Sequence, residues 1–148
     1  MNISRPDAFI DDLQEIMLET LENIVETMAD GECRASTTGD PGLVLEAQVP
    51  IVGEMEGVIT VRAIESVALG LAAIWAGCEP EELETQDALD TMSEFCNVFG
   101  GTAKTVLSDA TSLDMPSVRA APAKDFEPLS DSVSVSHDLG ILEVQLKV

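Results

Sequence analysis

The side chains best suited to chemistry lie in one segment, residues 87–107, with the sequence DALDTMSEFCNVFGGTAKTVL. Wound as an α-helix, at about 100° per residue, this segment has an apolar stripe: Leu89, Met92, Cys96, Phe99, Ala103 and Val106. A polar stripe lies roughly opposite: Asp90, Glu94, Asn97, Gly101 and Lys104. Glu94 and Asn97 are therefore expected one turn apart on the exposed face. An amide can hold a water through its oxygen without a change of protonation, and a carboxylate can pair with a cation.

Two adjacent glycines stand inside the same predicted helix. A mid-helix glycine costs about 1 kcal/mol relative to alanine, so Gly100 and Gly101 need a reason. Gly100 lies near the apolar stripe, where a close contact with a neighbouring element or a kink would account for it. Gly101 lies on the side of Glu94 and Asn97, where the missing Cβ would let another molecule approach the backbone. Simple tolerance of glycine on a solvated face is the alternative.

The chain before this helix predicts a helix, two strands and a second helix. The opening helix ends near residues 30–31 and carries apolar residues at every third or fourth position: Ile10, Leu13, Met17, Leu21, Ile24 and Met28. Residues 43–52 alternate in the manner of a half-buried strand, and residues 58–63 form its antiparallel partner. Residues 66–76 are nearly all apolar, which predicts a short buried helix.

The chain after this helix predicts extended structure. Residues 108–115 are expected to form a loop and residues 116–121 an extended segment that starts at a proline. A proline-containing loop at 122–130 then leads into a closing hairpin of residues 132–136 and 141–148. In the last strand alternate side chains point one way: Leu142, Val144, Leu146 and Val148.

This order of elements indicates an α/β fold of the α+β type in a single domain, residues 1–148. Each half has a long helix followed by strands, so the halves form a loose pseudo-duplication. A mostly antiparallel sheet with the long helices packed on one face is the natural architecture. Hydrophobic residues make up 45% of the chain and aromatic residues only 3%, so an aliphatic core is expected.

The charge balance excludes two classes of partner. The formal net charge is −21, with only seven lysines and arginines. Nucleic acid and anionic membranes would be repelled, so neither is expected as a partner. Most of the acidic residues are expected to form a solvated surface, and adaptation to high salt is an alternative explanation of this composition.

The cysteines and the one histidine predict no metal site. Cys33, Cys78 and Cys96 are widely spaced, and His137 cannot complete a zinc site with them by spacing. They are interpreted as reduced thiols. The N-terminus lacks a basic region followed by an apolar run, and the apolar stretch near residues 67–76 is shorter than the about 20 residues that a membrane span needs. A cytoplasmic protein is therefore expected.

The string Asp90-x3-Glu94-x2-Asn97 resembles the active-site signature of the CheC/CheX/FliY phosphatase family. The continuation Gly101-x2-Lys104 is also similar to CheX relatives, as are the opening helix and the order of elements. The opening helix has no Glu-x-x-Asn string, so the resemblance favours the single-site CheX type. The family signature ends in a proline, for which Pro116 or Pro122 is the match; the extended segment after Pro116 favours the former.

The resemblance implies a phosphatase that removes the aspartyl phosphate of a CheY-like receiver domain. Asn97 would orient the attacking water, and Glu94 would anchor the receiver by pairing with its active-site lysine. Asp90, Gly101 and Lys104 would contact the partner, although solvated roles for Asp90 and Lys104 remain open. The receiver would supply Mg²⁺, so the chain is expected to need no cofactor or metal of its own. A homodimer joined through the sheets is also implied, with the last strand, residues 142–148, as the edge.

Two other functions compete with this one. The first is a non-catalytic module of the same fold that binds a receiver or serves as a flagellar-switch-like adaptor. The second is a metal-dependent hydrolase built on the acidic connector at residues 79–87, whose carboxylates are instead interpreted as solvated: Glu79, Glu81, Glu82 and Glu84. His137 adjoins a predicted hairpin turn and is interpreted as a surface residue.

Overall fold

The computed structural model describes residues 36–53, 56–104, 111–127, 133–137 and 140–147, together with Glu15, Glu19 and Asn23. These last three are helical and exposed, and they are spaced four residues apart. They therefore fit the polar face of the predicted opening helix. The apolar positions predicted for that helix lie outside the described residues, as does Cys33.

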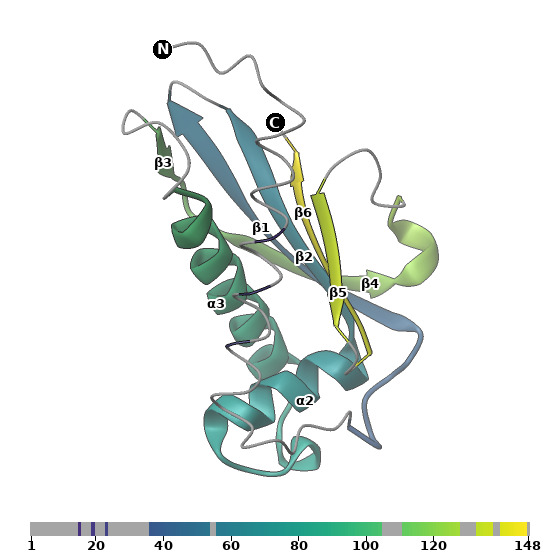
Figure 1. Cartoon of the computed structure of the whole chain (residues 1–148). Helices are drawn as coiled ribbons and strands as arrows, with labels where there is room; N and C mark the ends of the chain where they lie inside the picture. Colours follow the sequence, from purple (N-terminus) through teal and green to yellow (C-terminus); the bar gives the residue numbers. More distant parts are fainter. Residues whose placement is uncertain are drawn as a thin grey trace.

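Within the described residues, six strands form one sheet, and every pairing is antiparallel (Figure 1). The strands are β1 (Leu43–Gly53), β2 (Gly57–Ile64), β3 (Thr111–Leu113), β4 (Ser117–Pro122), β5 (Val133–His137) and β6 (Gly140–Lys147). Their order is β3-β1-β2-β6-β5, and β4 pairs with β1 next to β3. The predicted antiparallel pair, the extended segment before residue 122 and the closing hairpin are thereby confirmed.

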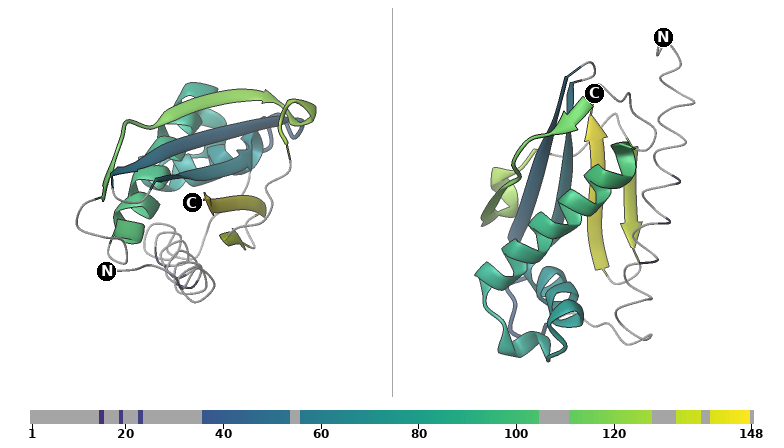
Figure 2. Two further views of the ribbon diagram at one scale, coloured as in Figure 1. Left: turned by 90° about the horizontal axis from the view of Figure 1, so that it is seen from above. Right: turned by 90° about the vertical axis from the view of Figure 1, so that its left-hand side faces the viewer.

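In the described ranges from residue 36 onward, two α-helices pack on the sheet. Helix α2 (Glu65–Ala76) follows β2 directly and ends at Gly77, whose φ of 69° suits glycine. Helix α3 (Thr85–Lys104) begins after a short 3₁₀ turn, η1 (Pro80–Glu82), and crosses one face of the sheet (Figure 2). Both helices lie where the sequence predicts them, and the predicted α+β architecture with helices on one face is confirmed.

The core lies between α3, α2 and the inner face of β1 and β2. Alternate residues of β1 are fully buried there, as their spacing predicts: Leu45, Ala47, Val49 and Ile51. The helix contributes Met92, Cys96 and Phe99 from its apolar stripe. Phe95 is equally buried, although it falls outside that stripe, because Trp75 of α2 packs against it with ring centroids 4.6 Å apart. Two of the largest buried side chains are therefore aromatic, in a core expected to be aliphatic.

Two expectations about the strands are wrong. Residues 108–115 were expected to be a loop, but Thr111–Leu113 forms β3 on the edge of β1. Strand β6 was expected to be a sheet edge, but it pairs with β2 on one side and with β5 on the other. The edge strand is therefore β5, because β6 lies between β2 and β5 and β5 has no further partner in the described sheet.

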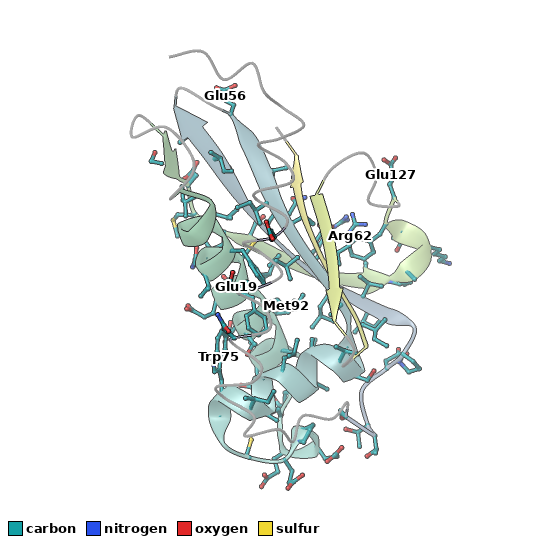
Figure 3. The ribbon with its side chains drawn as sticks, in the orientation of Figure 1. Glu19, Glu56, Arg62, Trp75, Met92 and Glu127 are labelled. Atoms are coloured by element: carbon teal, nitrogen blue, oxygen red, sulfur yellow. The ribbon has the colours of Figure 1, made fainter. Side chains whose placement is uncertain are left out.

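The outer face of the sheet carries an ion-pair cluster that the sequence pattern did not predict. Glu46 of β1 is buried and accepts from Arg62 Nε at 2.6 Å and from Arg119 Nε at 3.1 Å. Both guanidinium groups lie over the ring of Phe126, at 5.0 and 4.1 Å from its centroid. Arg62 also donates to the carbonyl oxygen of Glu127. Both residues are labelled in Figure 3. This Glu46 cluster ties β1, β2 and β4 to the segment after η2 (Ala123–Asp125).

Candidate functional site

Helix α3 presents its polar stripe to solvent. Asp90, Glu94, Asn97 and Gly101 are all exposed, while Met92, labelled in Figure 3, lies fully buried on the opposite side. The helix runs unbroken from Thr85 to Lys104, so the glycine pair does not end it. Glu94 and Asn97 are one turn apart on a continuous helix, and the predicted exposed pair is therefore present.

Neither member of this pair is used inside the described part of the molecule. No side-chain hydrogen bond or ion pair links Glu94 or Asn97 to another described residue. Asp90 differs, because its carboxylate accepts from Gln86 Nε2 at 2.9 Å. This i, i+4 contact is an ordinary helix-surface interaction and holds Asp90 in place. Lys104 is the last residue of α3, and its side chain lies outside the described residues.

The two glycines have different surroundings. A Cβ placed on Gly100 would lie 2.8 Å from Leu113 Cδ1, so glycine lets β3 pack closely against the helix, and a Cβ there would force the Leu113 side chain to shift. A Cβ placed on Gly101 would meet nothing within 4 Å. The close-contact interpretation of Gly100 is therefore confirmed. For Gly101, packing within the described residues gives no reason to avoid a side chain.

In the described part of α3, the buried thiol of Cys96 is not a reactive group. Burial raises the pKa of the Cys96 thiol to about 12, and the thiol donates to the carbonyl oxygen of Ile59 at 3.4 Å. A thiol that stays protonated is a packing group and not a nucleophile.

Three glutamates of the acidic connector, Glu79, Glu81 and Glu82, serve local structure. Glu79 and Glu82 form a reciprocal capping box around η1. Glu81 accepts from the backbone N–H and the hydroxyl of Thr37, at 2.8 and 3.1 Å. In the part of the chain that the structure describes, no group of three His, Cys, Asp or Glu side chains is arranged to hold a metal ion. His137 pairs with Gly140 at the β5–β6 turn, where the sequence placed it.

The surface around the polar stripe is acidic. Glu84, Asp87, Asp90 and Glu94 are exposed along the start of α3 and the turn before it. Arg62 and Arg119 belong to the Glu46 cluster on the other face of the sheet. The exposed face of α3 is therefore suited to a partner with positive charge at the contact.

The two candidate prolines lie at opposite ends of β4. Pro116 directly precedes the strand, three residues after the Leu113 that contacts Gly100, and Pro122 ends it opposite Leu43.

The sequence did not reveal the β3–α3 contact, because a three-residue strand has too few positions to show alternation. The one available signal was Gly100 itself.

Among the described residues, no helix has the length and apolar character needed to cross a membrane.

Solved structures of chemotaxis proteins share this fold. CheX from Vibrio vulnificus superposes with a TM-score of 0.65 at 18% identity, over 97% of this chain and 98% of that one. A CheC-like superfamily protein from Shewanella gives 0.62 at 18% identity, over 99% and 98%. CheX in the CheX–CheY–BeF₃–Mg²⁺ complex from Borrelia burgdorferi gives 0.62 at 17% identity, over 90% and 95%.

No curated protein matches the chain. Residues 45–138, however, match the family model described as "Chemotaxis phosphatase CheX". This range begins in β1 and includes all of α3, and with it Asp90, Glu94, Asn97, Gly101 and Lys104. The chain therefore belongs to the CheX family of chemotaxis phosphatases.

Proposed function

We propose that this protein hydrolyses the aspartyl phosphate of a CheY-like receiver domain, with Asn97 orienting the attacking water and Glu94 anchoring the receiver. The observation that carries the proposal is the exposed Glu94–Asn97 pair on an unbroken helix, with neither side chain engaged by another described residue. Membership of the CheX family and the Borrelia complex of CheX with CheY support the choice of partner. In that complex BeF₃ stands in for the phosphoryl group.

The reaction needs a water in line with the phosphorus–oxygen bond. The water oxygen bonds to phosphorus, the bond to the aspartate oxygen breaks, and the aspartate leaves as a carboxylate with inorganic phosphate as the other product. Little covalent chemistry is left for the protein, so positioning carries most of the catalysis. The Asn97 amide oxygen would accept a hydrogen bond from this water and fix its direction. The divalent metal of the receiver would neutralise charge on the phosphoryl oxygens.

The other residues of the polar stripe would act in docking. Glu94 would pair with the active-site lysine of the receiver, since a charge-assisted hydrogen bond fixes register as well as affinity. Gly101 would leave room for the receiver backbone one turn further along. Asp90 and Lys104 would contribute at the ends of the stripe. The chain would need no metal or cofactor of its own.

Assembly and location belong to the same proposal. A homodimer would form through a sheet edge. In the described sheet, β5 forms one edge, and β3 and β4, which both pair with β1, form the other. The protein would act in the cytoplasm, where it would meet its receiver.

Phosphate release from a panel of phosphorylated receivers, with and without the protein, tests the proposal. The wild type should accelerate release from at least one receiver. Asn97→Ala should lower kcat by about 100-fold or more, the scale of a lost positioning or transition-state contact. Its urea midpoint should not fall below that of the wild type, because Asn97 is exposed and alanine is the better helix former.

Glu94→Ala is the companion variant and should raise KM more than it lowers kcat. Equal activity of the wild type and Asn97→Ala would overturn the catalytic assignment. Tight binding of a phosphorylated receiver without faster phosphate loss would instead identify the non-catalytic adaptor.

A further inference from the structure

Exposed apolar side chains are few in the described part of the molecule. The large ones are Val52, Met115 and Val118, exposed by 37%, 80% and 39%. A single exposed apolar residue is ordinary on a protein surface, so only its position relative to the candidate site can indicate a binding role. Met115 and Val118 lie close together in sequence, in the connection from β3 to β4 and the start of β4. We call these two residues the apolar rim.

The backbone that carries Met115 is held in place. The N–H of Asp114 donates to the carbonyl oxygen of Pro50 at 3.0 Å, and the N–H of Met115 donates to Asp114 Oδ1 at 2.8 Å. Pro116 follows and fixes its own φ. On both sides the chain is paired with β1, through β3 and through β4. Met115 is therefore presented from a fixed backbone, which lowers the ordering cost of a contact.

The apolar rim lies on the Asn97 side of α3. Leu113 Cδ1 comes within 2.8 Å of the Cβ position at Gly100, so this side of the helix faces β3. Residues three apart are neighbours on a helix surface, and at 3.6 residues per turn Asn97 is rotated from Gly100 by about 60°. Since Gly100 is buried and Asn97 exposed, this rotation leads from β3 toward solvent.

The rim is also level with Asn97 along the helix. Helix α3 and strand β1 both rise toward the top of the view in Figure 1 and in the right-hand view of Figure 2, where they cross at an angle. From Leu113 to Ser117 the chain runs back along β1, from a position opposite Ile51 to one opposite Gln48. It therefore moves from the level of Gly100 toward earlier turns of α3, which brings the Met115 backbone level with the turn that carries Asn97.

We propose that the apolar rim is a docking contact for the receiver, taking an apolar patch next to the phosphorylated aspartate. This inference rests on the proposed function. A standard interface covers about 800 Å² on each partner, a patch of about 16 Å radius, whereas a helix is about 10–12 Å across. A receiver centred on Asn97 therefore extends over the neighbouring rim. The exposed acidic residues on α3 would speed encounter with positive charge on the receiver, and Met115 would lengthen the residence time of the complex.

The test is affinity for a receiver that carries beryllofluoride and Mg²⁺, measured for Met115→Ala and Met115→Lys. Both variants should raise Kd and KM by about tenfold, the scale of a buried interface anchor. Both should keep kcat within about twofold, because Met115 touches no reacting atom. The urea midpoint should stay at the wild-type value, since the side chain is 80% exposed. Val52→Ala is the matched control, because Val52 points to the opposite face of the sheet from the buried Ile51.

Kd values equal to the wild type in both Met115 variants would overturn this inference and leave the proposed function standing. A wild type that binds but does not accelerate phosphate release would defeat the proposed function, while Kd would still decide the role of Met115. A wild type that binds no receiver would contradict both the proposed function and this inference. Sedimentation adds one further outcome: if Met115→Lys dissociates a dimer and leaves Kd unchanged, the rim joins two copies of this chain and the inference fails.

Discussion

At the scale of residues, the candidate site consists of two exposed side chains and one glycine. Glu94 and Asn97 project from α3 without a partner among the described residues, and Gly101 opens space one turn further along. Helix periodicity predicted this exposure correctly, because all three positions belong to one rigid element. The roles of water positioning and anchoring stay predictions that rest on family resemblance.

The adjacent glycines provide a matched pair of variants. Gly101→Ala should stabilise the protein by about 0.5–1 kcal/mol, since it gains helix propensity and its Cβ meets nothing within 4 Å. The same variant should weaken receiver binding, because the methyl group fills the approach space. Urea unfolding and Kd together measure both effects.

Gly100→Ala is the control for that experiment. Its Cβ would press on Leu113 Cδ1 at 2.8 Å, so most of the propensity gain should be lost as Leu113 shifts. A Gly101→Ala variant that is more stable and still binds the receiver normally would show that no partner uses this space.

At the scale of elements, β1 organises the molecule. Its inner face carries the core under α3, its outer face carries Glu46, and its free edge accepts both β3 and β4. The alternation of its residues predicted the strand and its buried face. The same alternation did not predict the cluster around Glu46, because the partners Arg62 and Arg119 come from strands paired across the sheet.

The Glu46 cluster yields a prediction about stability. Glu46→Ala should destabilise the protein by about 3 kcal/mol, because it leaves the largely buried Arg62, 14% exposed, without its carboxylate. Arg119→Ala should cost less than about 1 kcal/mol, since that side chain is 54% exposed. Urea unfolding of the two variants, followed by circular dichroism, measures the difference. Equal losses would mean that exposure does not set the strength of these pairs.

At the scale of the whole molecule, charge is the dominant property. The chain carries a formal charge of −21, and the acidic residues on and before α3 are exposed. Self-repulsion of this size opposes the compact state, and salt screens it over about 10 Å at 0.1 M.

Added KCl should therefore raise the urea midpoint steadily up to about 1 M, by screening repulsion between carboxylates. An equal concentration of an uncharged osmolyte serves as the control for general solvent effects. Adaptation to high salt predicts a further rise above that range. A midpoint that falls with KCl would contradict both the screening argument and the salt-adapted interpretation.

The sequence by itself determined the local features of this protein. The helical stripe with Glu94, Asn97 and Gly101 on its solvent side and the buried face of β1 follow from periodicity, and the buried helix predicted at residues 66–76 follows from its apolar composition. A short stretch of chain carries each of these signals alone. Only the tertiary structure decided which segments meet. It placed β6 inside the sheet and β5 at its edge, brought Leu113 against Gly100, and buried Phe95 beneath Trp75. These contacts join residues far apart in the chain, so their free energy depends on pairing and packing that no local pattern records.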